Sequence, residues 1–597
     1  MLETALVPTT PLDLAGPDGQ PRALSVEDVV SVAREARPVL ALHEDGHQHR
    51  PLERAMQASA DWVTQQVDAI ESADAQPIYG INTGFGALSG REVFRSAYQA
   101  RVLSRNLLVS HATGTGEPLE EDVVRAGLLI RAHQLARGRS GVRIALVNRL
   151  LAILRAGIYP IVPRMGSLGA SGDLAPLAHL ALIVSRPPEP GPADRRVPMD
   201  DHRGEAWLRI EGPGPELDHM GRDWRTGERR WWRRVAGDEA MAELGGQMEL
   251  GPKEGLALTN GATLSAALAT LCLADAERLL DHAELALAMT LEAMRGFRDP
   301  FLPGLHAARP FLGQGESAAR VLAYVAGSEL LDRADAGVDP ERVPPQDPYS
   351  IRCGPPVIGA ARDALRWLRQ TVETEINSAV DNPLVLLDLP RAYKAVSGGN
   401  FHGAPLAYGL DLLKIVMTDC ASQCERRVFT LTSASFHDSS QPDRSLPPFL
   451  VDAPPGLVGL NSGMMIPQYT AAALVSAAKT LSHPDSVDSI PSSANQEDHV
   501  SMSMNAGLHA RQVLEQVEGV VAIELLVAAQ ALSLRADQGP PGRGTAAAMD
   551  RIRKRVAVLE HDRSLAADVE RLRLAVRSGE ILSAARAASA PGQAGLS

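Results

Sequence analysis

The stretch from Thr259 to Arg295 contains no proline, and its apolar residues recur at the spacing of an α-helix. It is much longer than an ordinary helix of a globular protein, which ends within about 20 residues. Similar patterns run through residues 360–379, 404–428 and roughly 503–535. Because several long helices of mixed polarity pack most readily against one another, the C-terminal half is predicted to form a helical bundle.

Charge and cysteine content narrow the classes of function. The 597 residues include 72 acidic and 59 basic ones, a formal net charge of −13, which argues against a general binder of nucleic acid or anionic membranes. Four cysteines without a framework spacing indicate a reducing compartment. Glu3 stands where a signal peptide needs positive charge, and no apolar run reaches membrane-spanning length. We therefore expect a soluble cytoplasmic protein whose partner is a small molecule.

Residues 184–246 differ from the rest of the N-terminal half. Up to about residue 182 the pattern is one of moderate helices broken by glycine and proline loops. The insert at about 184–246 lacks a helical period and holds four of the six tryptophans beside a cluster of arginines. It has two interpretations: a partner-binding or regulatory flap, or a partly ordered surface excursion whose tryptophans pack locally. The second is favoured, since long loops are often linker-like.

The loop GSLGASGDLAPL at 166–177 carries the triplet Ala170, Ser171 and Gly172 between two apolar helical segments. Taken alone it predicts only a tight turn. Gly172, however, has no side chain to block its amide nitrogen from attacking the Ala170 carbonyl carbon, and Ser171 can lose water to leave a methylidene group. The product would be an electrophilic ring, and Asp173 is placed to help move protons during its closure.

Seven segments in order along the chain resemble the aromatic amino acid ammonia-lyase family. They are YGINTGFG (79–86), NLLVSHATGTGEPL (106–119), GSLGASGDLAPLAH (166–179), KEGLALTNG (253–261), QDPYSIRCGP (346–355), SGGNFHGAP (397–405) and SANQEDHVSM (493–502). Members of this family build a methylidene-imidazolone (MIO) group from Ala-Ser-Gly. The resemblance thus implies an MIO formed autocatalytically from Ala170, Ser171 and Gly172, with no external cofactor.

The resemblance also implies a fold and an assembly. The expected fold is mainly α and fumarase/aspartase-like, with an N-terminal domain carrying the MIO loop at 1–250 and a long helical bundle with C-terminal helices at 251–597. Bundles of four chains would form a homotetramer whose active sites are shared between subunits. The insert is much longer than the connection typical of bacterial relatives. As a surface excursion it should be removable, at about 186–244, with the tetramer and the chemistry largely intact.

The family's catalytic and binding positions carry over to matching residues. Tyr79 would be the general base that takes the β proton of the substrate, provided that a positive or hydrogen-bonding environment lowers its proton affinity. Arg352 would grip the substrate carboxylate with two parallel hydrogen bonds, although a structural ion pair is the alternative. Other residues would line the MIO group and the substrate, with backbone capping or core packing as their alternative: Asn260, Gln346, Tyr349 and Phe401.

Two positions predict the substrate. Ser110 and His111, followed by Ala112, fit the histidine-selective pattern of the family rather than the patterns for phenylalanine or tyrosine. Glu497 supplies a carboxylate that can accept an imidazole N–H, and a buried carboxylate without such a partner would be costly. We therefore expect a carbon-nitrogen lyase that deaminates L-histidine to trans-urocanate and ammonium.

Three alternatives stay open. An MIO-dependent aminomutase, or an ammonia-lyase for another aromatic amino acid, would keep the same motifs. A lyase fold retained only for binding or structure is disfavoured by the intact Ala-Ser-Gly triplet, Tyr79 and Arg352. His43, His47 and His49 have a spacing that can ligate zinc, but no firm carboxylate or cysteine set accompanies them, so no metal site is expected.

Overall fold

The structure is a computed structural model, and it describes residues 10–590 except 44–49, 70–76, 91–93, 95, 193, 213–218, 332–345, 391–392, 434–444 and 452–458. The N-terminal helices are α1 (Val26–Arg34), α2 (Pro51–Asp68), α3 (Ala97–His111), α4 (Glu121–Ala136), α5 (Ile144–Ala156), α6 (Leu174–Leu182), α7 (Gly237–Met241) and α8 (Glu254–Thr259). The later helices are α9 (Thr263–Ala293), α10 (Pro303–Ala307), α11 (Leu312–Tyr324), α12 (Tyr349–Arg352), α13 (Gly354–Ile376), α14 (Ala404–Thr432), α15 (Met465–Leu481), α16 (Ser503–Ser533), α17 (Arg543–Arg553), α18 (Ala566–Ser578) and α19 (Glu580–Ser589).

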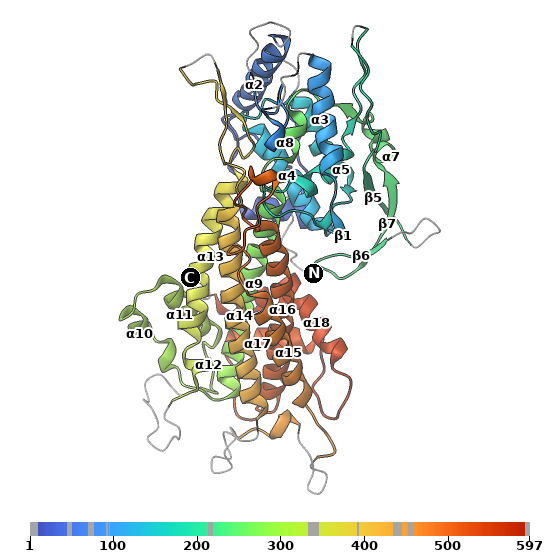
Figure 1. Cartoon of the computed structure of the whole chain (residues 1–597). Coiled ribbons are helices and arrows are strands. Elements are labelled where there is room, and N and C mark those ends of the chain that lie inside the picture. The colour runs from blue at the N-terminus through green and yellow to red at the C-terminus, as the bar shows by residue number, and fades with distance from the viewer. Residues whose placement is uncertain are drawn as a thin grey trace, which may run out of the picture.

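The long helices α9, α13, α14, α15 and α16 run side by side and form an elongated bundle (Figure 1). The helix α9 is at its centre, because nearly all of its residues are buried and because α4, α13, α14 and α16 all pack on it. Its alanines and leucines allow this close approach on every side. The mainly helical fold and the four long helices expected from the sequence are thus confirmed.

One described helix, α16, is long and apolar enough to cross a membrane by those two criteria alone. Within its most apolar window, however, 89% of the residues are buried inside the protein. This burial is that of a core helix, and α14, α9 and α15 supply the surfaces that cover it.

The N-terminal helices sit at one end of the bundle, and α4 joins the two parts (Figure 1). Almost every residue of α4 is buried, since α1, α5 and α9 pack around it. The helix α1 begins at a capping box in which the Ser25 hydroxyl accepts from the Asp28 backbone N–H and the Asp28 carboxylate accepts from the Ser25 N–H. The packing of α4 on α1, α5 and α9 anchors the N-terminal part on the central helix α9.

The insert forms a β-sheet, so the prediction of a partly ordered surface excursion is wrong for its described residues. The strands β5 (Glu205–Ile210), β6 (His219–Arg222) and β7 (Arg229–Ala236) join β2 (Ile158–Pro160) in an antiparallel sheet of order β2-β5-β7-β6. The other strands are β1 (Thr115–Pro118), β3 (Pro163–Met165), β4 (Ser185–Arg186), β8 (Met248–Glu249), β9 (Leu384–Val385) and β10 (Ala395–Val396). Arginines within β7 hid the strand's alternation. They bind carboxylates, Arg230 in a half-buried pair and Arg233 and Arg234 in pairs at the surface.

The tryptophans of the insert do not pack only among themselves. Trp232 is buried edge-on against Tyr159 of β2, with ring centroids 4.7 Å apart. Trp224, in the turn between β6 and β7, has the Arg34 guanidinium 3.8 Å from its ring centroid and that of Arg278 at 4.8 Å. We call residues 219–236 the insert arm, because they reach from the sheet to α1 and α9.

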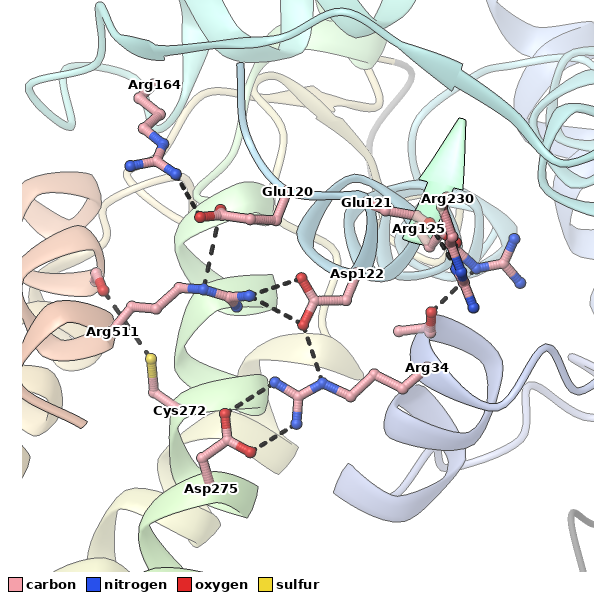
Figure 2. A network of polar contacts seen from close by, with 12 residues as sticks. Arg34, Glu120, Glu121, Asp122, Arg125, Arg164, Arg230, Cys272, Asp275 and Arg511 are labelled. Carbon is pink, nitrogen blue, oxygen red and sulfur yellow. Dashed lines mark hydrogen bonds and ion pairs between the residues drawn. The ribbon is translucent and has the colours of Figure 1, made fainter. Parts of the chain in front are cut away.

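A network of ion pairs lies beneath the insert arm (Figure 2). The Arg34 Nε donates to Asp122 at 2.9 Å, and its two terminal nitrogens donate to Asp275 at 2.7 and 2.8 Å. Arg511 of α16 donates to the same Asp122 at 2.9 Å, and Arg230 of the arm binds Glu121 at 2.6 Å. Excision of 186–244 would uncover these charges. That the tetramer and the chemistry stay largely intact without the insert remains a prediction.

Candidate active site

The Ala170-Ser171-Gly172 triplet forms a tight turn just before α6. Ser171 has φ = 53° and Gly172 has φ = 83°, so two successive residues are in the left-handed region. For serine this conformation is uncommon and stores strain, a feature often found at functional sites. A Cβ added at Gly172 would overlap the Gly261 carbonyl group, so only glycine fits there. We call residues 167–173 the Ser171 turn.

Two N–H donors converge on the Ser171 carbonyl oxygen. The Asn260 Nδ2 donates to it at 3.1 Å and the Gly261 backbone N–H at 3.0 Å. In return the Asp173 N–H donates to the Gly261 carbonyl oxygen at 2.9 Å. The segment after α8 therefore holds the turn in place and presents a preformed pair of donors to one oxygen.

Asp173 is fully buried below the turn. Its carboxylate accepts from the Ser265 N–H at 2.8 Å, from the Ser265 hydroxyl at 2.9 Å and from the Ser167 hydroxyl at 3.1 Å. Burial raises the pKa of Asp173, and these hydrogen bonds only partly oppose it. A carboxyl group of this kind suits proton transfer better than a solvated one does.

Glu497 connects the turn with the two residues expected to recognise and deprotonate the substrate. The Ser171 hydroxyl donates to Glu497 Oε1 at 3.0 Å, and the Ser492 hydroxyl donates to Oε2 at 2.8 Å. The Glu497 charge is felt at both Tyr79 and His111, where it raises the pKa of each. The structure thus brings Tyr79, His111, Ser171, Asn260 and Glu497 together.

In this chain the pKa of Tyr79 is raised above the ordinary value for a tyrosine. Burial is the largest cause, and Glu497 adds to it, while the Gly86 N–H that donates to the phenolic oxygen at 3.1 Å opposes both. A tyrosine that acts as a base needs the opposite shift, a lowered pKa. For His111 burial lowers the pKa, so that its imidazole is neutral near pH 7, and its Nδ1 lies 2.9 Å from the Ser110 hydroxyl.

Gln346, Tyr349 and Arg352 lie far from the Ser171 turn of the same chain. Gly354, two residues beyond Arg352, packs on Leu287 near the end of α9, whereas the turn packs on Gly261 before its start. At 1.5 Å per residue, the stretch of α9 from Thr263 to Leu287 is roughly 36 Å long. Figure 1 accordingly has α12 and α8 toward opposite ends of the molecule.

Around α12, the three residues form a surface site of their own. The Arg352 guanidinium lies 4.3 Å from the Tyr349 ring centroid, and its Nε donates to the Asp347 carbonyl oxygen at 3.1 Å. Gln346 and Arg352 line a surface cavity, and the Tyr349 side chain is 69% exposed. Among the described residues none accepts a hydrogen bond from the terminal nitrogens of Arg352, which could therefore bind a carboxylate.

Phe401 lies at the same end of the bundle as the Ser171 turn. A Cβ added at Gly403 would overlap the Ser503 hydroxyl, and one added at Gly169 would overlap that of Ser501. Phe401 is therefore in the neighbourhood of the turn, and its side chain is half-buried.

Two residues that shape this site were missed by the sequence analysis. Gly261 donates to the Ser171 carbonyl oxygen, and Arg131 of α4 binds the carbonyl oxygen of Asn260 at 2.7 Å. The signal for Arg131 was a charged residue inside the apolar run LLIRAHQLA. Among the described residues no group of three or more histidines, cysteines or carboxylates could hold a metal ion. His47 and His49 lie outside those residues.

This fold and turn agree with known proteins. The family profile described as "Aromatic amino acid lyase" matches residues 24–554, and the chain belongs to this family. Members of the family in general depend on an MIO group.

The chain is similar to individual members of this family. Histidine ammonia-lyase of Anaeromyxobacter dehalogenans is 47% identical over 85% of this chain and 90% of its own, and that of Caldanaerobacter subterraneus subsp. tengcongensis is 41% identical over 94% and 96%. The solved histidine ammonia-lyase of Trypanosoma cruzi has a TM-score of 0.75 at 30% identity, covering 96% of this chain and 95% of that one. Tyrosine aminomutase of Streptomyces globisporus has a TM-score of 0.79 at 31% identity, covering 98% and 100%.

Proposed function

We propose that this protein is an ammonia-lyase that converts L-histidine to trans-urocanate and ammonium. The observation that carries the proposal is the position of Glu497, which hydrogen-bonds Ser171 and acts electrostatically on His111. Two polar groups beside the reactive turn suit an imidazole ring, which has both a donor and an acceptor, and they would be left unpaired by a phenyl ring. The curated relatives named histidine ammonia-lyase support the same substrate.

The Ser171 turn fits the formation of an MIO group. The Gly261 carbonyl group fills the space that a Cβ at Gly172 would need, so only glycine fits there. Glycine has no side chain that could shield its own nitrogen. In this proposal the nitrogen bonds to the Ala170 carbonyl carbon with loss of one water, and Ser171 loses its hydroxyl as a second water. When formed, the group supplies an electrophilic carbon conjugated to the Ser171 carbonyl, whose oxygen becomes more negative when a nucleophile adds. The donors from Asn260 and Gly261 already point at this oxygen.

The remaining residues bind the substrate and move its β proton. His111 and Glu497 hold the imidazole, and Tyr79 takes the β proton as general base. Since burial and Glu497 raise the pKa of Tyr79 in the free chain, the ammonium group of the bound substrate is the positive charge that we expect to favour the ionised tyrosine. Phe401 packs beside the turn.

Arg352, Tyr349 and Gln346 come from another chain in this proposal. Their distance from the turn supports a homotetramer whose active sites are shared, because only another copy brings the Arg352 guanidinium to the substrate carboxylate. Exposed apolar side chains along the bundle support burial by other copies: Trp367, Tyr408, Ile415, Ile466 and Tyr469.

Product analysis tests the activity. Purified protein is incubated separately with L-histidine, L-phenylalanine and L-tyrosine, and the products are identified. We expect trans-urocanate and ammonium from histidine and little product from the other two. Preference for another amino acid would contradict the substrate. Accumulation of β-histidine would instead establish an aminomutase. The structural likeness to tyrosine aminomutase is the reason to test for this product.

Mixed tetramers test the sharing of sites. Chains with Ser171→Ala lack the electrophile, and chains with Arg352→Met lack the clamp, so each variant alone should be nearly inactive. If sites combine residues of different chains, dissociating and reassembling the two variants together should restore part of the activity. Absence of any recovery in tetramers shown by mass to be mixed would refute shared sites.

A further inference from the structure

Arg131 is a fully buried cation behind the two donors that face Ser171. It belongs to α4, and its guanidinium reaches the segment that links α8 to α9. Its Nη2 donates to the Asn260 carbonyl oxygen at 2.7 Å and also to that of Ala257, while Nη1 donates to the Thr263 hydroxyl at 3.2 Å. The guanidinium thus fixes the backbone on both sides of Gly261.

A single peptide group joins Arg131 to the reactive turn. The oxygen of the Asn260–Gly261 peptide accepts from Arg131, and the N–H of the same peptide donates to the Ser171 carbonyl oxygen at 3.0 Å. A hydrogen bond to the oxygen of an amide polarises the amide and makes its N–H a stronger donor. The effect is larger from a charged donor and in a dry interior.

The charge of Arg131 is not cancelled by a direct partner. Within the described part of the chain its hydrogen bonds go to neutral oxygens, and none goes to a carboxylate. The nearby Asp381 is paired with Lys253 and accepts from the Ser140 hydroxyl. Burial lowers the pKa of Arg131 to about 10, so the side chain is still cationic at neutral pH.

We propose that Arg131 is a positioning residue that strengthens the electrophile, because it holds and polarises the Asn260–Gly261 peptide against the Ser171 carbonyl oxygen. This inference rests on the proposed function only in requiring that the MIO group forms, and it does not depend on which amino acid is the substrate. Arg131 touches no reacting atom. It acts through the peptide, and its charge favours the negative charge that develops on the Ser171 oxygen.

The chain offers a matched control on the same helix. Arg125 also uses a buried guanidinium to bind backbone carbonyl oxygens, those of Val32 at 2.7 Å and Ala33 at 3.1 Å. These belong to α1, whereas Arg131 binds the segment between α8 and α9. Substitution of Arg125 therefore reproduces the structural cost of losing a buried arginine without touching the Asn260–Gly261 peptide.

The test compares Arg131→Met, Arg131→Lys and Arg125→Met with the wild type. Ring formation is followed by near-ultraviolet absorbance, and reactivity by the rate at which cyanide, a small nucleophile, consumes that absorbance. For Arg131→Met we expect the ring to form, kcat and the cyanide rate to fall together by about tenfold to a hundredfold, and KM to change little. Arg131→Lys keeps the charge and should be intermediate. Arg125→Met should lose stability and keep both rates.

Each other outcome has a definite meaning. A cyanide rate in folded Arg131→Met equal to that of the wild type overturns the proposal. So does a folded Arg131→Met without ring absorbance, which assigns Arg131 to ring formation. If neither Arg131 variant folds while Arg125→Met does, Arg131 is a structural residue and the proposal fails. A wild-type protein without absorbance or cyanide reaction contradicts the proposed function instead.

Discussion

The pKa values of buried carboxylates are raised near the Ser171 turn and lowered beneath the insert arm. Near the turn, burial raises the pKa of Asp173 and raises that of Glu375 to about 7. Beneath the arm, burial works in the same direction, but Arg511 and Arg34 outweigh it at Asp122, and Arg34 and Arg278 do so at Asp275, so that the pKa of each is lowered. The difference is the presence of arginines that bind the carboxylates directly.

The two regions therefore have different tasks. The turn is held by neutral donors and backbone contacts, and among the described residues no arginine binds its carboxylates directly. This arrangement is ready to stabilise charge that appears during a reaction. Beneath the arm the charges are already balanced: Arg34 joins α1 to α9, Arg511 joins α16 to α4, and Arg230 joins the arm to α4. Substitutions at the turn should change turnover at nearly constant stability, and substitutions at the arm should do the reverse.

Ser171→Ala should have the largest effect. Without the hydroxyl no methylidene carbon can form, so turnover should fall by at least about a thousandfold, which is more than 4 kcal/mol of barrier. Stability should change little, because the substitution removes only a hydroxyl that ring formation would itself expel. Initial rates, near-ultraviolet absorbance and urea unfolding check the three parts. Retained activity would remove the basis for an MIO in this protein.

Tyr79→Phe should be next. Removal of the phenolic hydroxyl takes away the general base, and kcat should fall by about 10²–10⁴-fold while KM changes less. Because the pKa of Tyr79 is raised, the wild-type kcat/KM should climb with pH on the alkaline side, and this limb should be absent from the variant. A variant within a few-fold of wild type would mean that another residue is the base.

Arg34→Met, beneath the insert arm, should lower stability and leave turnover unchanged, the opposite of the substitutions at the turn. The Arg34 side chain is only 2% exposed, and its loss leaves Asp122 and Asp275 without a main partner, so the free energy of unfolding should drop by about 3–5 kcal/mol with turnover unchanged. The lowered pKa values make this stabilisation complete above the ordinary value of 3.8 and progressively lost as pH falls below it.

The control for Arg34→Met is Arg225→Met on the insert arm. Arg225 forms a half-exposed ion pair with Glu35 at 3.4 Å, so its loss should cost less than about 1 kcal/mol. Urea unfolding between pH 3 and pH 8 measures both variants. Equal effects of the two substitutions would show that the arm does not depend on the buried pairs.

The sequence predicted the turn far better than the arm, for a physical reason. Ser171, Asn260 and Glu497 lie in short motifs whose residue types report their chemistry locally, and the structure brings them together. The ion pair of Arg34 with Asp275 joins residues 241 positions apart, and neither neighbourhood predicts the other. A charged residue is usually solvated, and the arginines of the insert indicated surface. Arg233 and Arg234 are partly exposed, whereas the buried pairs beneath the arm are made by Arg34 and Arg511.

Arg352 marks a second limit of prediction from one chain. Its motif indicates a carboxylate clamp, and the residue does lie on an exposed site beside Tyr349, yet roughly 36 Å of α9 separates that site from the Ser171 turn. A motif gives the chemical role of a residue but not the subunit that it serves. The long helices, in contrast, were predictable because a helical period is a local property.

Glu375→Gln should have a smaller effect than Arg34→Met and the opposite pH dependence. Within the described residues the buried Oε1 of Glu375 has no hydrogen-bond partner, and burial with the charge of Asp173 raises its pKa from 4.5 to about 7. The native state therefore keeps a proton that the unfolded state releases, so the wild type loses stability as pH rises from about 4.5 to 7. The variant lacks this loss and should gain on the order of 2 kcal/mol relative to wild type by pH 8 and nothing near pH 4. Glu373→Gln, on the exposed face of the same helix, is the control and should show no such trend. A gain for Glu375→Gln that is independent of pH would mean that the carboxyl group is solvated, and the contrast between the two regions would then rest on the arm alone.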